Sequence, residues 1–338
     1  MQRRAMRAVV VEAPGDQRAL QVLDRPVPEP AAGELRIRVA WSAANWSDVQ
    51  KRQGIYPNPQ TYPLILGAEA SGVVDAVGSG VPARRWIGRR VAALCGPRLC
   101  GGHAEHVAVP LEYVIPVPDG VGLELAAAFP LAALTAYHLL RTAHVVRRGD
   151  VILVHSAAGS VGLAITQIAQ LVGAIVIGTV GTAAKVALVR KHGAQLVVDR
   201  SREDFVEAAM KFTGGRGVDL VIDSLGGEIL PRSFDALRYY GRVINIGEAS
   251  GEPDFPVRNK LYERSTSMAG YELLHAKPGA TAWRRGVRFV TSRLESGELT
   301  MPIGGVFRID EIARVHEIFE DRSNSGKLLL DIASRDVA

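Results

Sequence analysis

Small residues that separate a predicted strand from a predicted helix form the clearest candidate for ligand binding in this sequence. Apolar, partly β-branched residues predict a buried strand over Val151–His155, and apolar residues at helical spacing predict a helix over Val161–Val172. Such a turn directs backbone N–H groups and the positive end of the helix toward one point, where a pyrophosphate can bind. We therefore predict a dinucleotide-binding turn made by Ala158, Gly159, Ser160, Val161 and Gly162.

Two glycines of this turn have separate expected roles. Gly159 allows the backbone to approach the phosphates, and Gly162 allows the helix to pack closely on the strand. Ala157 replaces the first glycine of the usual G-x-G-x-x-G pattern, so the motif alone is a weak signal. A second predicted strand over Ala174–Val180 gives it the context of a βαβ unit. The alternative is an ordinary strand–helix turn that binds nothing.

The end of the second strand indicates which dinucleotide to expect. NAD sites usually carry an acidic residue about 20 residues after the glycines, where it binds the ribose 2′-hydroxyl. The segment Gly178–Thr182 has no acidic residue, and Lys185 follows it within one turn. Hydroxyls and cations suit a 2′-phosphate, which favours NADPH, although a solvated helix lysine would also explain Lys185. The candidate cofactor contacts in this region are Thr179, Gly181, Thr182, Lys185 and Arg200.

The elements that must position this turn fall into two patterns. The N-terminal part is rich in short apolar or alternating runs and in glycine and proline, which predicts a β-rich domain. Its predicted strands are Met6–Glu12, Leu35–Trp41, Leu64–Gly67, Ala70–Val77, Arg90–Leu94 and Ala104–Val109. From Leu123 onward a helix-rich pattern begins, with a helix expected over Leu125–Leu140 and broken by Pro130.

Strands then alternate with helices, which predicts an α/β fold with a doubly wound parallel sheet and a ligand at the carboxyl ends of its strands. Later strands are expected at Gln195–Val198, Val218–Asp223 and Val243–Gly247, and helices at Ala183–Lys191, Glu203–Phe212 and Ile229–Leu237. The tail predicts helices over Ala282–Leu294 and Asp310–Glu320 and a strand over Lys327–Ile332. The expected domains are 1–125, completed by 273–338, and a nucleotide-binding domain over 126–272.

Composition excludes several other classes of protein. The 338 residues are enough for two domains, with 47% hydrophobic and 22% charged residues as in ordinary globular proteins. The net charge is +5, but the arginines are scattered, so we expect no nucleic-acid partner. The two cysteines cannot make a disulfide framework, which fits a reducing, cytoplasmic location. We find no signal peptide and no apolar run of membrane length, so no membrane partner is expected.

Further motifs, taken in order, resemble a known family. They include Asn45-x-x-Asp48, Arg52–Pro57, Pro63-x-x-x-Gly67-x-Glu69, the turn above and a terminal Ser325-Gly326-Lys327. Together they resemble the medium-chain dehydrogenase/reductase superfamily, specifically its zinc-free quinone oxidoreductase branch, from about residue 6 to residue 332. The resemblance implies a Rossmann domain that binds NADPH, a β-rich GroES-like catalytic domain, and a homodimer formed by edge pairing around Leu261–Leu274.

Departures from the zinc-dependent members of that superfamily argue against a metal. The residue before Glu69 is Ala68 where those enzymes have histidine, and the Ser42–Asn45 segment has no cysteine. His103 and His106 are three apart in a strand-like segment, which is poor spacing for zinc. We therefore expect no metal site. Within the branch, Gln50, Arg89 and Arg200 depart from the usual residues, which affects substrate size and phosphate contacts.

A zinc-free site favours conjugated carbonyl compounds, because hydride addition to an enone or quinone spreads the charge over an enolate or phenolate. The resemblance places Asn45, Asp48 and Tyr56 on the loop that lines the substrate cleft. Tyr56 is the expected proton donor and Asn45 a hydrogen-bond donor; simple packing of Tyr56 and a structural turn at Asn45 are the alternatives. Glu69 is expected to brace the wall between the domains, and a role as a base is the alternative. Further cofactor contacts implied by the resemblance are Thr135, beside the nicotinamide, and Ser224, Ile246 and Lys327.

Three functions remain open. The first is an NADPH-dependent oxidoreductase that reduces quinones or α,β-unsaturated carbonyl compounds, which are small molecules. The second is an enoyl-thioester reductase, although nothing in the sequence marks a site for an acyl carrier. The third is a protein that binds NADPH without turnover, in a structural or RNA-associated role, as zeta-crystallins of this branch have been recruited.

Overall fold

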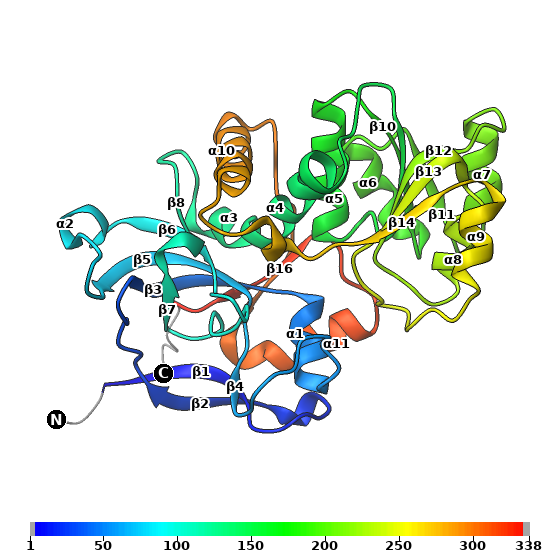
Figure 1. Ribbon diagram of the computed structural model, residues 1–338. Coiled ribbons are helices and arrows are strands. Elements are labelled where there is room, and N and C mark those ends of the chain that lie inside the picture. Colours follow the sequence, from blue (N-terminus) through cyan, green and yellow to red (C-terminus); the bar gives the residue numbers. More distant parts are fainter. Residues whose placement is uncertain (1–3, 334–338) are drawn as a thin grey trace. The chain divides into compact units, whose positions relative to one another are not determined.

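A computed structural model describes residues 4–333 (Figure 1). The chain forms two compact units, one made of residues 4–131 with 277–333 and the other of Ala132–Ala276. These divisions lie a few residues from the expected domain limits at 125 and 273. Among the described residues, no helix is long and apolar enough to cross a membrane.

The unit Ala132–Ala276 is built on a six-stranded sheet whose strands all run parallel. The spatial order is β11-β10-β9-β12-β13-β14, which is the order of a doubly wound dinucleotide-binding fold. The strands are β9 (Val151–Val154), β10 (Ile175–Val180), β11 (Leu196–Asp199), β12 (Val218–Asp223), β13 (Leu237–Asn245) and β14 (Ser267–Gly270). The predicted α/β class with a parallel sheet is therefore confirmed.

Helices follow the strands of this sheet in alternation. They are α5 (Ser160–Leu171), α6 (Val186–Lys191), α7 (Phe205–Phe212), α8 (Ile229–Ser233) and α9 (Val257–Glu263), with a 3₁₀ turn at Ala183–Lys185. β9 and β12 are buried along their whole length, because helices cover both faces of a parallel sheet. The core beneath the helices includes Leu153, Phe205 and Val243.

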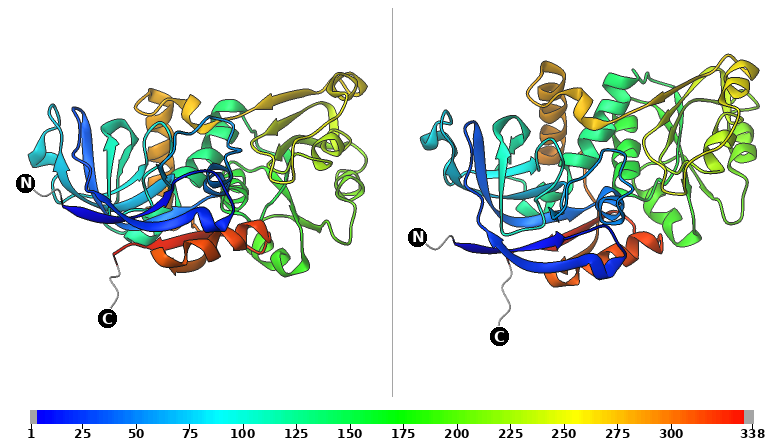
Figure 2. Two further views of the ribbon diagram at one scale, coloured as in Figure 1. Left: turned by 90° about the horizontal axis from the view of Figure 1, so that it is seen from below. Right: turned by 60° about the horizontal axis from the view of Figure 1, so that its bottom comes forward.

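The other unit contains two sheets that are mainly antiparallel. A three-stranded sheet has the order β2-β1-β4, formed by Leu20–Pro26, Ala5–Val11 and Leu64–Ile65, and β1 and β2 are the long blue pair in both views of Figure 2. A seven-stranded sheet has the order β15-β16-β3-β5-β6-β8, with β7 paired to β3. Its strands are β15 (Ile303–Arg308), β16 (Lys327–Asp331), β3 (Glu34–Ala44), β5 (Glu69–Val77), β6 (Arg90–Leu94), β8 (Val114–Pro116) and β7 (His106–Pro110).

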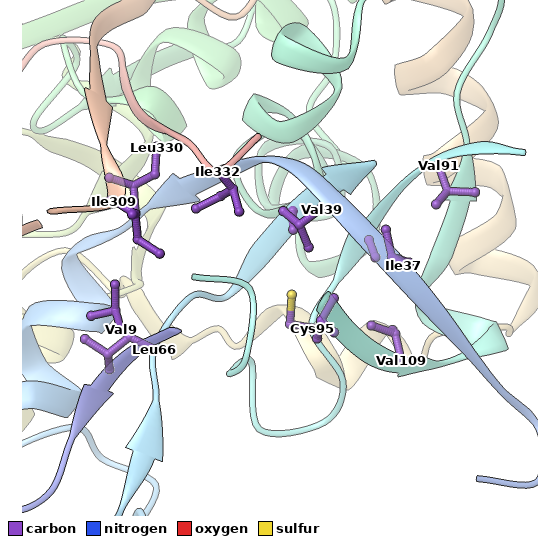
Figure 3. Close-up of a cluster of buried hydrophobic side chains, with 14 of the residues drawn as sticks. Val9, Ile37, Val39, Leu66, Val91, Cys95, Val109, Ile309, Leu330 and Ile332 are labelled. Carbon is purple, nitrogen blue, oxygen red and sulfur yellow. The ribbon is translucent and has the colours of Figure 1, made fainter. Parts of the chain in front are cut away.

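The long strand β3 organises this second sheet. Its first half pairs with β7 and its second half with β16, so the C-terminal strand lies against residues 41–44. Bulges near Arg36 and Val39 accompany this change of partner. Apolar side chains from β3, β5, β16 and α11 meet in one core, of which Figure 3 shows Ile37, Val39 and Leu330. The helices are α1 (Trp46–Gln53), α2 (Ala83–Trp86), α3 (Leu123–Ala128), α10 (Thr281–Ser296) and α11 (Ile312–Glu320), and α4 (Pro130–His138) crosses the division after Leu131.

Some predicted elements were wrong in extent. The helix expected over Ile229–Leu237 ends at Ser233, and the strand expected from Val243 begins at Leu237. Tyr239 and Tyr240 in that strand are 68% and 76% exposed, so its first half lacks the buried pattern that marks a strand. Asp48 was expected on a loop but lies in helix α1, whose polar sequence gave no helical signal.

Candidate functional site

The turn between β9 and α5 has the geometry of a phosphate-binding turn. Gly159 is the N-cap of α5, and it has no side chain that could accept a hydrogen bond from the first helical turn. The backbone N–H groups that begin the helix are therefore available to an anion. Gly159, Ser160 and Val161 are partly exposed, whereas Ala158 and Gly162 are buried.

Gly162 lies where the helix approaches the preceding chain most closely. A Cβ atom at Gly162 would lie 2.6 Å from Ala157 Cα and 2.6 Å from Ser156 O. A Cβ at Gly159 would meet only Ser156 O, at 3.3 Å. The requirement for glycine at 162 thus comes from packing inside the protein, and at 159 the structure leaves nearly enough room for a side chain.

The carboxyl ends of adjacent strands bring other predicted residues to the same edge of the sheet. Gly181, Arg200, Ser224 and Ile246 follow β10, β11, β12 and β13. Arg200 approaches Gly181, because a Cβ on Gly181 would lie 3.9 Å from a guanidinium nitrogen of Arg200. Gly181 and Thr182 are exposed, while Arg200, Ser224 and Ile246 are partly exposed. Lys185 is half-buried, and this burial lowers the pKa of its ammonium group.

Thr179 has a partner inside the protein. Its side chain is fully buried, and its hydroxyl lies 2.9 Å from Nδ1 of His155. Nε2 of His155 lies 3.0 Å from the hydroxyl of Ser233. Burial, with a smaller contribution from the charge of Arg200, lowers the pKa of His155 to about 3, so the ring is neutral. Thr179 therefore contributes to a buried hydrogen-bonded chain at the end of β10. The sequence analysis did not identify His155 and Ser233, which complete this chain.

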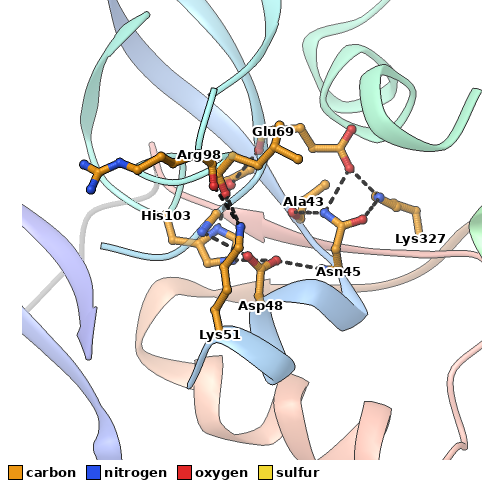
Figure 4. Close-up of polar contacts among 11 residues, drawn as sticks. Ala43, Asn45, Asp48, Lys51, Glu69, Arg98, His103 and Lys327 are labelled. Carbon is orange, nitrogen blue, oxygen red and sulfur yellow. Dashed lines mark hydrogen bonds and ion pairs between the residues drawn. The ribbon is translucent and has the colours of Figure 1, made fainter. Parts of the chain in front are cut away.

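A second cluster of predicted residues lies in the unit made of residues 4–131 with 277–333 (Figure 4). Asn45 Nδ2 donates to Ala43 O and to Glu69 Oε1, at 3.1 Å each. Lys327 Nζ donates to Asn45 Oδ1 at 2.6 Å and pairs with Glu69 Oε1. The second carboxylate oxygen of Glu69 accepts from the backbone N–H of Leu131 at 2.7 Å. Lys327, predicted as a cofactor contact, is 1% exposed in this network.

Asp48 serves the local backbone. One of its carboxylate oxygens accepts from the N–H of Asn45 at 2.9 Å, and the other from the N–H of Gly67 at 3.2 Å. His103 Nε2 lies 3.7 Å from Asp48, beyond hydrogen-bonding distance, and His103 Nδ1 lies 2.7 Å from the hydroxyl of Ser42. Ser42, Asp48 and His103 are each 0% exposed, so this set cannot meet a substrate in this arrangement.

Tyr56 follows α1 and is partly exposed. The ammonium group of Lys51 lies 4.9 Å from the centre of its ring, within the range of a cation–π interaction. Lys51 is fully buried and donates to the carbonyl oxygens of Arg98, at 3.2 Å, and Leu99, at 2.5 Å. A buried cation with fixed partners thus lies against one face of the phenol.

Potential metal ligands do not assemble. Within residues 4–333 there is no group of three or more His, Cys, Asp or Glu side chains that could hold a metal ion. Ala68, at the position matched to the histidine of zinc-dependent relatives, is fully buried and has no donor atom. This set of donors does not fit a catalytic zinc ion.

A parallel sheet in dinucleotide-binding order, in a chain that also forms a β-rich unit, is typical of nucleotide-dependent dehydrogenases and reductases. Residues 31–119 match the family model of the alcohol dehydrogenase GroES-like domain, and residues 160–291 match that of the zinc-binding dehydrogenase family. The chain belongs to the medium-chain dehydrogenase/reductase superfamily, in its quinone oxidoreductase branch.

Individual relatives cover nearly the whole chain. A probable quinone oxidoreductase of Schizosaccharomyces pombe is 35% identical over 330 residues, which are 98% of each protein. A 2-haloacrylate reductase of a Burkholderia species is 34% identical, with 90% of this chain and 92% of the relative covered. The crystal structure of Escherichia coli quinone oxidoreductase complexed with NADPH has a TM-score of 0.89 at 30% identity, with 96% and 99% covered.

Proposed function

We propose that this protein is an NADPH-dependent oxidoreductase that reduces quinones or α,β-unsaturated carbonyl compounds by hydride transfer, without a metal. The observation that carries the proposal is the carboxyl edge of the parallel sheet. There the uncapped first turn of α5 suits a pyrophosphate, and Lys185 and Arg200 supply positive charge where β10 ends without an acidic residue. A relative complexed with NADPH and relatives named as quinone and 2-haloacrylate reductases support the assignment.

The residues present favour conjugated substrates. NADPH, when bound, supplies the hydride. A simple ketone would develop an alkoxide that needs a Lewis acid, and the donors among residues 4–333 do not fit zinc. A conjugated carbonyl develops a delocalised enolate or phenolate instead, which a hydrogen-bond donor and a proton can satisfy.

Tyr56 is the proposed proton donor. Its phenol O–H gives a proton to the enolate and is restored from solvent, while Lys51 holds the ring from one face. Asn45 is proposed to contact the bound ligand, and Thr135, partly exposed on α4, to lie beside the nicotinamide. Asp48 holds Asn45 and Gly67 in place and takes no part in proton transfer.

The testing experiment follows NADPH oxidation with quinones, enones and enoyl thioesters after exhaustive chelation. We expect turnover with the first two classes and no loss on chelation. Tyr56→Phe should lower turnover about tenfold to a hundredfold while the dissociation constant for NADPH stays unchanged. Tyr240→Phe, at an exposed tyrosine of the other unit, is the control.

Each contrary result has a definite meaning. Turnover with enoyl thioesters alone would assign the chain to thioester reduction. NADPH binding without turnover of any class would leave a structural role. Full turnover of Tyr56→Phe would assign the proton to another donor, and activity lost together with a bound zinc ion would refute metal independence.

We also propose that the protein acts as a homodimer in the reducing cytoplasm. β14 is the last strand of its sheet and, among the residues that the structure describes, pairs only with β13, so its outer edge can pair with a second copy. Both cysteines are free thiols, which suits a reducing compartment.

A further inference from the structure

Lys51 is a buried cation that is held by backbone carbonyl groups. It lies in the last turn of α1 and is 0% exposed. Its ammonium group donates to the carbonyl oxygens of Arg98, at 3.2 Å, and Leu99, at 2.5 Å (Figure 4), and it forms no ion pair within residues 4–333. Carbonyl oxygens that accept from an ammonium group favour its charged form. A fixed positive charge, not neutralised by a carboxylate, therefore lies at this end of α1.

The end of α1 brings Tyr56 against this charge. Gly54 is the C-cap of the helix with φ of 76°, a left-handed conformation that favours glycine. The N–H of Gly54 donates to Lys51 O at 3.2 Å, and that of Ile55 donates to Gln50 O at 3.0 Å. After this turn, the ring centre of Tyr56 lies 4.9 Å from Nζ of Lys51. A cation at this distance attracts a neutral phenol weakly and a phenolate more strongly, because the phenolate carries a full negative charge.

A neighbouring thiol shows the same electrostatic influence. Burial raises the pKa of the Cys100 thiol, and the charge of Lys51 is the largest of the effects that oppose this rise. The charge of Lys51 thus favours an anion that forms near it. Tyr56 is only partly buried, so desolvation opposes its ionisation less than it would in the interior.

We propose that Lys51 is a positioning residue that stabilises the phenolate of Tyr56 and so makes this tyrosine a stronger proton donor. This inference rests on the proposed function, in which the hydride comes from NADPH and the proton from Tyr56. The O–H bond of Tyr56 breaks, its proton goes to the enolate, its electron pair stays on the phenolate oxygen, and water then returns a proton. A free phenol ionises at about pH 10, and a proton donor acts best when it ionises near the working pH.

The first test measures the ionisation of Tyr56 in the free protein. Tyrosine is labelled with ¹³C at Cζ, and the Tyr56 signal is assigned by its loss in Tyr56→Phe. In the wild type this signal should titrate at lower pH than that of N-acetyltyrosine amide. Lys51→Met should move the midpoint up by about 1–3 pH units, the usual effect of one adjacent charge, and Lys51→Arg, which keeps the charge, should restore most of the shift.

Other titratable groups near Lys51 are controlled in the same experiment. Burial raises the pKa of Tyr62, whose separate signal is followed directly, and Cys100→Ser removes the nearest thiol. The midpoint of Tyr56 should respond to Lys51→Met equally with and without Cys100. The titratable and charged groups around Lys51 are Asp48 on α1, Tyr62, and Cys95, Arg98, Cys100 and His103 on the segment 95–103.

The second test asks whether Lys51 acts through Tyr56 in turnover. Lys51→Met should lower kcat about threefold to tenfold in the wild-type background and leave it unchanged in the Tyr56→Phe background, because the phenol that it assists is absent. A merely structural role would lower kcat by the same factor in both backgrounds.

Two outcomes would overturn the proposal: a Tyr56 midpoint that Lys51→Met does not raise, or an equal loss of kcat in both backgrounds. If Lys51→Met does not fold, the wild-type titration decides, and a midpoint at or above that of N-acetyltyrosine amide refutes the proposal. Full turnover of Tyr56→Phe would refute the proton-donor role in the proposed function instead, and the titration would still decide whether Lys51 stabilises the phenolate.

Discussion

Two cations near the end of β10 are proposed to distinguish the phosphorylated dinucleotide from the unphosphorylated one. Arg200 lies beside Gly181, and Lys185 is half-buried at the end of the following 3₁₀ turn. Lys185→Ala should therefore reduce the preference for NADPH over NADH by about 1–3 kcal/mol, the range for charge-assisted hydrogen bonds. The measurement is the pair of dissociation constants for the two nucleotides.

Lys191→Ala is the matched control, because Lys191 ends α6 with an exposed side chain. It should leave the ratio of the two constants unchanged. A wild-type protein with equal affinity for NADPH and NADH would refute the assignment of these cations to the 2′-phosphate.

His316 on α11 is a buried side chain whose replacement should stabilise the protein. It is 0% exposed, and neither ring nitrogen has a hydrogen-bond partner in the part of the chain that the structure describes. Burial, with smaller contributions from Arg52 and His103, lowers its pKa from 6.5 to about 3. His316→Leu should raise the free energy of unfolding by about 1 kcal/mol, since an unpaired buried polar group is removed.

The same substitution should flatten the pH dependence of stability. Between about pH 3 and 6.5 the unfolded chain binds a proton at His316 that the folded chain does not. The contribution of this group to the free energy of unfolding is complete above pH 6.5 and is lost as the pH falls. On acidification, His316→Leu should therefore lose less free energy of unfolding than the wild type, as measured by urea denaturation. An unchanged slope would contradict the burial of a neutral imidazole.

At the scale of elements, the packing of α5 against the turn after β9 separates two glycines. Gly162→Ala would place a Cβ 2.6 Å from backbone atoms that cannot yield, which should cost about 1–3 kcal/mol and weaken NADPH binding by displacing the helix. Gly159→Ala should leave stability nearly unchanged, because its nearest contact is 3.3 Å and its φ is −73°. Urea denaturation measures the free energy of unfolding of the two variants. Equal values would contradict the predicted difference between positions 159 and 162.

A larger side chain at position 159 then probes the ligand. Gly159→Val should keep the fold and lower the affinity for NADPH, because the side chain occupies space that the phosphates need. Normal affinity in this variant would show that the pyrophosphate binds elsewhere.

The elements that sequence patterns predicted well are those buried on both sides. Val218–Asp223 and Arg90–Leu94 match their strands residue for residue, because their apolar runs end at polar or glycine-rich turns. Elements with exposed or polar faces were missed, among them α1, β2 and β15. In α1 the buried Lys51 and Arg52 have the residue types of a solvated surface, so periodicity could not reveal the helix.

The candidate site shows the same division between local and distant signals. The turn from Ala158 to Gly162 could be predicted because five neighbouring residues encode it. The network of Asn45, Glu69 and Lys327 joins residues as far as 282 positions apart, and no local pattern records their pairing. The family resemblance identified Asn45 and Lys327 as candidate site residues, but only the structure shows which groups they bind.

At the scale of the whole molecule, each large sheet has an edge strand whose outer side pairs with nothing in the described chain. β14 ends the parallel sheet and β15 ends the seven-stranded sheet. Both carry an exposed apolar side chain, Met268 at 37% and Val306 at 48% exposure. Unpaired edges invite pairing with another chain unless charge or irregular geometry blocks them.

The proposed homodimer uses the edge of β14, and this choice can be tested against β15. In a two-fold pairing of β14 strands, each edge faces its own copy, so Met268→Lys would bring two like charges together and should shift the protein toward monomer. Val306→Lys places the same charge on the other edge strand and should leave the assembly unchanged. Light scattering during gel filtration at matched concentrations measures the molar mass of each variant, which is compared with the mass of one chain, 36.3 kDa. A wild-type monomer would refute the dimer, and dissociation caused by Val306→Lys alone would move the interface to β15.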